Sequence, residues 1–118
     1  MKYLLLILCL SLTIPALAQA QDEFELKPSQ SMLMTGKGPG QDGAINPFAG
    51  QDCYAIVENM GKIEVSIRIQ KKGKILQTIS VTAGATKRVK LLKDQELYLD
   101  ASDGGMVQAK VNFEKLEE

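Results

Sequence analysis

The stretch Lys62–Gln70 reads K-I-E-V-S-I-R-I-Q, and it decides the fold. Its four β-branched aliphatic side chains, at positions 63, 65, 67 and 69, alternate strictly with polar or charged ones. A period of two in such residues predicts a β-strand with one buried face and one solvent-facing face. Segments on both sides follow the same rule, so we expect this strand to begin the core.

The same alternation predicts further strands along the chain. Before the central stretch it covers residues 23–27, 31–35 and 53–59, and after it residues 74–82, 86–92, 96–101 and 106–114. Turns rich in Gly, Pro or Asp separate these segments, and none of them has a helical period. The chain is therefore expected to be all-β, an antiparallel β-sandwich of about seven strands.

Two bends flank the central strand and predict its pairing. The bend before it, Asn-Met-Gly, predicts a hairpin that places Val57 opposite Ile63. The bend after it, Lys-Lys-Gly, is interpreted as a three-residue loop that places Ile69 opposite Ile75. Both registers gather the apolar side chains on one face, so we expect these three strands to be neighbours in one sheet.

Residues 1–20 have the features of a secretory signal peptide. A short cationic start precedes an apolar run from Leu4 to Leu17, and small residues follow, so that cleavage after Ala18 or after Ala20 fits the pattern. The run is too short to be a membrane span. We expect an exported protein, periplasmic or extracellular, whose residues 21–118 form a single domain without a transmembrane segment.

The charge balance of the mature chain excludes one class of partner. Without Lys2 the chain has 13 basic and 14 acidic residues, so no global attraction of a polyanion is expected. Aromatic residues make up 5% of the chain and Trp is absent, which leaves few side chains for stacking on bases. Nucleic acid is therefore not an expected partner.

The segment 35–52 is the first candidate binding element. It contains five glycines and two prolines in 18 residues, which excludes a regular strand or helix. Loops of this length in a compact domain are usually either functional or disordered. The apolar Ile45 and Phe48 favour a semi-ordered loop that tucks against the body. The candidate ligand-binding residues here are Lys37, Asp42, Asn46 and Phe48.

A basic run is the second candidate. From Val65 to Lys93 there are eight Lys or Arg residues and no Asp or Glu. If strands 62–70, 74–82 and 86–92 share a sheet, several of these residues converge on one patch that could bind an anionic partner. The other interpretation is that lysines on exposed strands prevent aggregation. The candidates are Arg68, Lys71, Lys72, Lys74, Lys87, Arg88 and Lys90.

Catalytic chemistry has few residues to use. The chain has no His, and Cys53 is the one cysteine of the predicted mature chain, so the usual base and nucleophile pairs are missing. We expect no enzyme and no catalytic residues, with a small hydrolase using Asp42 and Asp52 as the third alternative. Cys53 is expected to be a buried core residue, the alternative being an intermolecular bridge or a reactive thiol.

Cofactor and metal motifs are also absent or incomplete. Gly38–Gly43 matches G-x-G-x-x-G, but Pro39 interrupts it and no helix is predicted after it, so no dinucleotide is expected. Transition metals lack His and Cys ligands. Calcium stays open as an alternative, because it needs only oxygen donors. Two groups could supply them: Asp42, Asn46 and Asp52, or Asp100, Ser102 and Asp103. We expect no cofactor and no metal.

One resemblance covers residues 57–91, about a third of the mature chain. Val57-x-Asn59-x-Gly61, the alternating strand to Ile69, and V-T-A-G-A-T-K-R-V-K-L ending at Leu91 resemble the immunoglobulin-like modules of bacterial surface proteins, including the cell-adhesion-related family. The resemblance implies an immunoglobulin-like β-sandwich with a binding or structural role and no catalytic residues.

These observations lead to two alternative functions. The first is a small exported non-catalytic binding or interaction module, with the cell envelope as a candidate location, whose partner is an unknown protein or an anionic cell-envelope glycan. The second is a periplasmic inhibitor or chaperone-like partner of another protein, which uses an exposed strand edge or the long loop.

Overall fold

The computed structural model describes residues 23–38 and 40–116, and the predicted signal peptide lies outside them. Within these residues the chain forms eight β-strands and no helix, so none that could cross a membrane. The strands are β1 (Glu23–Leu26), β2 (Ser31–Thr35), β3 (Cys53–Asn59), β4 (Val65–Lys71), β5 (Lys74–Val81), β6 (Thr86–Leu91), β7 (Glu96–Ala101) and β8 (Val107–Lys115). The predicted all-β class is confirmed, with eight strands where about seven were expected.

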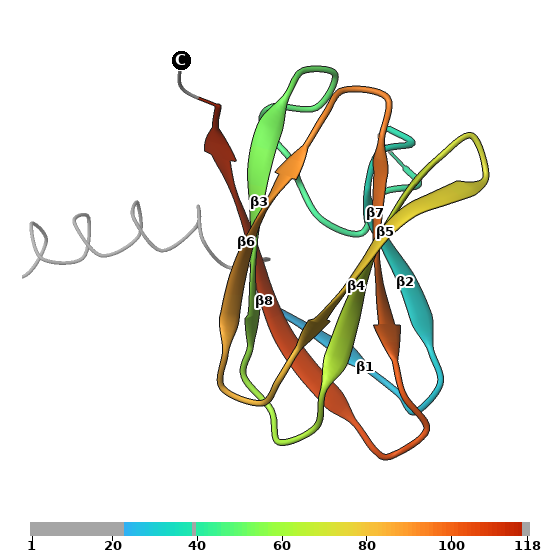
Figure 1. The fold of residues 1–118 in the computed structure, drawn as a ribbon, viewed down its shortest axis with the longest axis vertical. Helices are drawn as coiled ribbons and strands as arrows, with labels where there is room; N and C mark the ends of the chain where they lie inside the picture. The colour runs from blue at the N-terminus through green and yellow to red at the C-terminus, as the bar shows by residue number, and fades with distance from the viewer. Residues whose placement is uncertain (1–22, 39, 117–118) are drawn as a thin grey trace, which may run out of the picture.

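The strands form two four-stranded antiparallel sheets that face each other (Figure 1). One sheet has the order β1-β8-β3-β6 and the other the order β2-β7-β4-β5. Every connection except the β4–β5 hairpin crosses from one sheet to the other. This is the strand order of a jelly roll, in which two Greek keys wrap into a sandwich. The predicted antiparallel β-sandwich is confirmed.

The strand order also defines what the chain shares with immunoglobulin-like modules. In the immunoglobulin arrangement the first two strands are neighbours in one sheet. Here β1 and β2 lie in different sheets. The likeness to that family therefore lies in the two-sheet architecture.

The predicted hairpin between β3 and β4 is wrong, because the two strands lie in different sheets. Asn59 explains the crossing. Its Nδ2 donates hydrogen bonds to the carbonyls of Ile63 (2.8 Å) and Val81 (2.9 Å), and its Oδ1 accepts one from the amide of Gly61 (3.0 Å). These bonds draw the chain across to the other sheet, so Val57 pairs with β6 and β8 instead of Ile63.

The β4–β5 hairpin exists, but the three-residue loop predicted for it is wrong. Lys71 pairs with Lys74, which leaves a two-residue turn of Lys72 and Gly73. Both turn residues have positive φ, 51° and 80°, as a type I′ turn requires. A bulge then shifts the register, so that Ile69 pairs with Gln77 and not with Ile75.

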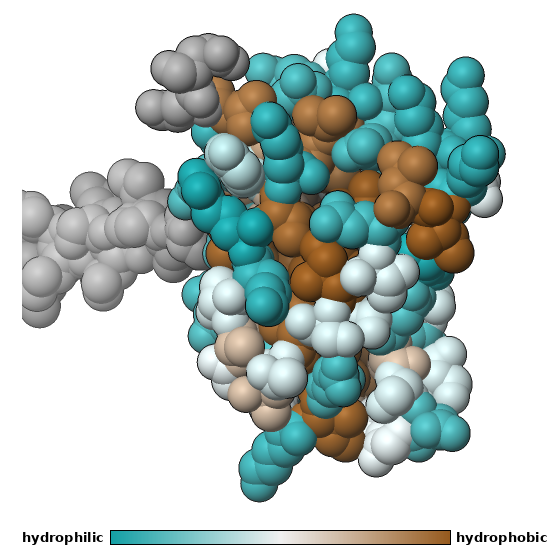
Figure 2. All heavy atoms as spheres, viewed as in Figure 1, coloured by the Kyte–Doolittle hydropathy of each residue, from teal (hydrophilic) through white to brown (hydrophobic). Residues whose placement is uncertain are grey.

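The core lies between the sheets and is built from the alternating residues. Val65, Ile67 and Ile69 of β4 are buried, as the central stretch predicts, whereas Ile63 precedes the strand and is half-buried. Cys53 is also buried, which confirms its predicted place in the core. Figure 2 shows apolar side chains along the middle of the face turned to the viewer, with polar ones over much of the rest of that face.

Candidate functional site

The first part of the loop between β2 and β3 is held by the carboxylate of Asp42. The side chain of Asp42 accepts hydrogen bonds from the backbone amides of Gly36 (3.1 Å), Lys37 (2.8 Å) and Gly38 (3.0 Å). It also accepts one from the hydroxyl of Thr35 (3.3 Å). The negative charge therefore serves three amides that no strand satisfies, and it closes the first part of the loop into a ring.

The second part of the loop is held by Asn46 and Phe48. The Oδ1 of Asn46 accepts a hydrogen bond from the Phe48 amide (2.8 Å), and its Nδ2 reaches the Thr35 hydroxyl (3.4 Å). Phe48 packs against the core as predicted, but Ile45 does not: its side chain is 69% exposed. Of the two apolar residues expected to pack the loop against the body, Phe48 alone therefore does so.

Gly36 lets the loop approach the start of β7 closely. Its φ is +132°, and a Cβ placed there would lie 2.7 Å from the carbonyl oxygen of Gln95 and from the Cα of Glu96. Any larger residue would push the loop away from the β6–β7 turn, because those atoms belong to backbone.

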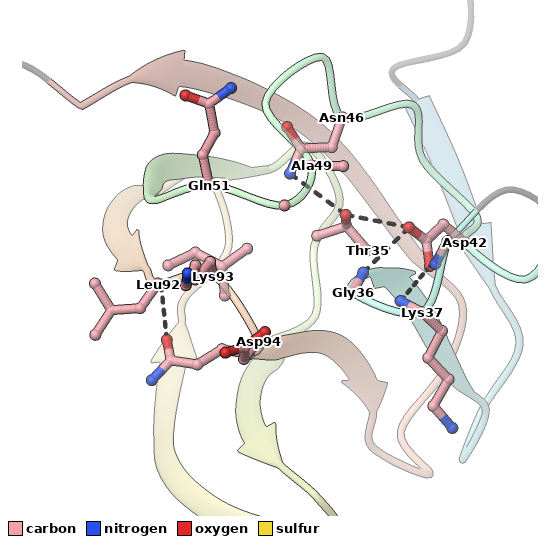
Figure 3. A pocket seen from close by; sticks show the side chains of 14 residues that line it. Thr35, Gly36, Lys37, Asp42, Asn46, Ala49, Gln51, Leu92, Lys93 and Asp94 are labelled. Atoms are coloured by element: carbon pink, nitrogen blue, oxygen red, sulfur yellow. Dashed lines mark hydrogen bonds between the residues drawn. The ribbon is translucent and has the colours of Figure 1, made fainter.

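Between the loop and the β6–β7 turn lies a hollow of about 250 Å³, which we call the loop hollow (Figure 3). Thr35 and Gly36 form one side of it, and the turn residues Lys93 and Asp94 form the other. A hydrogen bond ties the β6–β7 turn to the end of the loop, because the Lys93 amide donates to the carboxylate of Asp52 (2.8 Å).

Three side chains around the loop hollow offer polar groups to a ligand. Within the described residues no hydrogen bond or ion pair engages the side chains of Gln51, Lys93 and Asp94. Asp94 has a φ of 75°, and its carboxylate lies at the lining of the hollow. The three residues line different parts of the loop hollow, and in Figure 3 the side chain of Gln51 extends away from Asp94.

The predicted loop residues have different places. Asp42 and Asn46 line the loop hollow, but their polar atoms hold the loop itself. Lys37 lines it through its backbone, while its side chain extends away from the hollow in Figure 3. Phe48 packs against the hydrophobic core and does not line the loop hollow.

Sequence reasoning missed the β6–β7 turn as part of this site. Lys93 and Asp94 read as an ordinary turn between two strands. Their position beside the loop follows from the crossing connections, which bring the ends of β2, β6 and β7 together. No local spacing rule carries that information, so the turn had no signal of its own.

The predicted basic patch does not form as expected, because β6 lies in the other sheet from β4 and β5. Lys71, Lys72 and Lys74 lie together at the exposed tip of the β4–β5 hairpin. Lys87, Arg88 and Lys90 are exposed on β6. The assumption that the three basic strands share a sheet is therefore wrong.

Arg68 belongs to a polar network on the outer face of its sheet. Its Nε and Nη2 donate to the two carboxylate oxygens of Asp100, each at 2.8 Å, and its guanidinium lies 4.2 Å from the centre of the Tyr98 ring. Ser31 donates to the same carboxylate (2.6 Å). These hydrogen bonds, led by that from Arg68, lower the pKa of Asp100, and the same pairing raises the pKa of Arg68.

Arg88 has a similar arrangement on the opposite sheet. Its guanidinium stacks 3.8 Å from the centre of the Tyr54 ring, and its Nε donates to Glu114 at 3.1 Å. Both arginines of the predicted patch thus have an acidic and an aromatic partner inside the chain. Each arginine links strands on the outer face of its own sheet, so its charge is only partly available to a ligand.

Three carboxylates of the calcium and carboxylate-pair alternatives have hydrogen-bond partners inside the fold. Among residues 23–38 and 40–116 no group of three or more His, Cys, Asp or Glu side chains could hold a metal ion. Asp42 is bonded to its loop amides, Asp52 to the Lys93 amide, and Asp100 to Arg68. Burial raises the pKa of the Cys53 thiol, which makes it a poorer nucleophile.

Comparisons with protein-family models, with curated proteins and with solved structures find no match for this chain. The site has to be interpreted from its own geometry.

Proposed function

We propose that this chain is a small exported, non-catalytic binding module, and that the loop hollow is its recognition site. One observation carries the proposal. Asp42 and Asn46 hold the described part of the Gly-rich segment 35–52 in shape, and among the described residues no hydrogen bond or ion pair engages the side chains of Gln51, Lys93 and Asp94 around the loop hollow. A loop ordered in advance loses less entropy when it binds a ligand.

The chemistry of the loop hollow fits an anionic cell-envelope glycan. Sugar hydroxyls both donate and accept, so they match the amide of Gln51 and the carboxylate of Asp94. The ammonium of Lys93 can pair with a carboxylate or phosphate on the glycan. This ligand class agrees with an exported, periplasmic or extracellular location, for which the features of residues 1–20 are the support.

The proposal is tested by cosedimentation with purified peptidoglycan sacculi and with lipopolysaccharide vesicles. Asp94→Gly removes the carboxylate while keeping a residue suited to positive φ, so the turn should stay intact. We expect this variant and Gln51→Ala each to reduce retention about tenfold, the effect of roughly 1.4 kcal/mol.

The matched control is Asp103→Ala, which removes an exposed carboxylate from the β7–β8 turn. It should be retained like the parent protein. Equal retention of Asp94→Gly and Asp103→Ala, or no retention of the parent on either material, would contradict glycan binding at the loop hollow.

A second candidate function is an inhibitor or chaperone-like partner of another protein. A different observation favours it, namely that β5 is an edge strand with exposed apolar side chains. Exposed edges accept extended segments of other chains through backbone hydrogen bonds.

A further inference from the structure

The four edge strands of the sandwich differ in how they are protected. The edges are β1 and β6 in one sheet, and β2 and β5 in the other. Natural sheets block open edges with charged side chains, with bulges or with a covering loop, because bare edges pair with other chains. Each edge can therefore be examined for such a device.

Three of the edges carry charged side chains or a covering loop. Glu23 and Glu25 place charges on β1, and β6 has Lys87, Arg88 and Lys90. The edge of β2 is covered by the long loop, because the amides of Gly43 and Ala44 donate to the carbonyls of Leu33 and Met34, both at 2.9 Å.

The edge of β5 is different. Residues 75–80 read I-L-Q-T-I-S, a run without charge, proline or glycine, and β4 is the strand's one partner among the described residues. The side chains of Ile75 and Leu76 are 57% and 49% exposed. Figure 2 shows apolar side chains reaching the surface beside the β4–β5 hairpin.

The register shows where a partner strand would lie. From Val81 to Gln77 the pairing with β4 is regular, and the bulge falls between Gln77 and Ile75. A guest strand can therefore continue the sheet along residues 77–80 and meet the apolar side chains of Ile75 and Leu76 beyond the bulge.

The charge at the hairpin tip indicates the chemistry of the guest. Lys71, Lys72 and Lys74 are exposed there, and no ion pair engages them within the described part of the chain. The chain has no acidic residue between Val65 and Lys93, and Glu96, which lies opposite Gln70 near the tip, accepts hydrogen bonds from Gln70 and Tyr98. Acidic residues on a partner segment that ends beside the tip would therefore complement the positive charge of these lysines.

We propose that β5 is a docking edge for an extended segment of a partner protein that combines alternating apolar residues with acidic residues at the end beside the hairpin tip. This inference rests on the second of the two proposed functions and names the chemistry of its partner. It does not involve the loop hollow, because no residue of β5 lines that hollow.

The test uses a synthetic peptide of alternating valine and threonine with two glutamates at each end, so that either strand direction places acid beside the lysines. Amide chemical shifts of the protein are followed by NMR during titration to about 1 mM, a range that detects weak protein–peptide affinities. We expect shifts on residues 74–80 and slower hydrogen exchange of their outward amides. A peptide with lysines in place of the glutamates should bind at least tenfold more weakly.

Two pairs of variants separate the apolar and the charged contributions. Ile75→Ser with Leu76→Ser should weaken binding about tenfold, whereas Ile45→Ser, which removes another exposed apolar side chain, should leave it unchanged. Lys71→Gln with Lys74→Gln should weaken it several-fold, whereas Lys87→Gln with Lys90→Gln alters the net charge equally on β6 and should not.

The outcomes distinguish the two sites. Absence of binding at 1 mM, equal binding of the lysine peptide, or shifts confined to β6 or to residues 36–52 overturns the docking edge. Dimerisation of the free protein with protected β5 amides also overturns it, since the edge then belongs to a second copy. Retention on sacculi tests the loop hollow alone, because β5 does not line it. A failure of the docking edge therefore leaves the glycan-binding proposal unaffected, and the reverse also holds.

Discussion

Polar side chains at two positions form hydrogen bonds with backbone groups that are not paired within a strand. Asp42 satisfies loop amides, and Asn59 satisfies carbonyls at the point where the chain leaves one sheet for the other. Each supplies bonds that the backbone itself lacks, in keeping with the rule that buried polar groups find partners. At the residue scale the fold therefore depends on a few side chains with specific hydrogen-bonding chemistry.

Asn59 is the more consequential of the two, because its side chain is 1% exposed. Asn59→Ala leaves the carbonyls of Ile63 and Val81 without their donor, so we expect a loss of about 2–4 kcal/mol in the free energy of unfolding. Asn59→Asp should cost more at pH 7 than alanine does, since a carboxylate cannot donate and would face two carbonyls.

Urea unfolding monitored by fluorescence or circular dichroism measures these effects, with Asn112→Ala on the exposed face of β8 as the control. If Asn59→Asp is as stable as Asn112→Ala, the hydrogen bonds of Asn59 do not hold the crossing between the sheets.

Asp100 predicts a dependence of stability on pH. Its pKa is lowered in the folded protein by Arg68, so its contribution is complete above the pKa of about 4 expected for the unfolded chain. As the pH falls from there through the lower folded pKa, the carboxylate takes up a proton and the contribution disappears.

The measurement compares the parent protein with Asp100→Asn in urea between pH 2 and pH 7. The parent should be the more stable protein at neutral pH, and the gap in the urea midpoint should narrow steadily below pH 4. A gap of constant size across that range would show that the pairing with Arg68 does not stabilise the fold. Asp103→Asn, on an exposed turn, is the control for the loss of one carboxylate.

At the scale of elements, the sequence identifies the strands well and their partners poorly. Alternation is local, so it places β2, β3 and β7 at the residues where the structure has them. Pairing is not local. Nothing in the pattern of Cys53–Asn59 tells a hairpin from a crossing, because either arrangement buries the same side chains. The basic patch was predicted wrongly because it depends on strand pairing. The β6–β7 turn was missed as part of the site for the same reason.

The β4–β5 turn gives a test at this scale. Lys72 has a positive φ of 51°, a conformation that favours Asn or Gly, so Lys72→Asn should raise the free energy of unfolding by about 0.5 kcal/mol. Gly73→Ala should lower it by about 1 kcal/mol, since the φ of 80° is strained for alanine.

Thermal unfolding of both variants checks the assignment of the turn. Gly104→Ala is the control, because a Cβ there meets only ordinary contacts and the residue does not have positive φ. A three-residue loop with lysine at an ordinary φ would make Lys72→Asn neutral or destabilising, and that result would contradict the observed register.

For the whole molecule, the jelly-roll order joins the two ends of the described chain. β1 pairs with β8, so Glu23 lies opposite Lys110, and β2 pairs with β7. Neither sheet is complete until distant segments have come together, which makes stability a property of the entire sandwich. We therefore expect the described strands to unfold as one cooperative unit.

Cys53 reports on that cooperativity. It is buried at the start of β3, a central strand that pairs with both β6 and β8, and burial raises the pKa of its thiol. In a chain carrying Cys9→Ser, a thiol reagent at pH 8 should label Cys53 only when the sandwich opens. The free energy of opening obtained from the labelling rate should equal that of unfolding in urea, and it should fall with urea at the same slope.

The matched control replaces the buried thiol by an exposed one, with Cys53→Ser and Ala83→Cys in the β5–β6 turn. This cysteine should react at the rate of an unfolded peptide at every urea concentration. If Cys53 instead reacts at a rate that urea does not change, β6 opens alone, because it is the one edge strand that covers the start of β3 from its side. Cooperativity would then stop at the inner strands, and the sandwich would have to be described as a stable centre with separable edges.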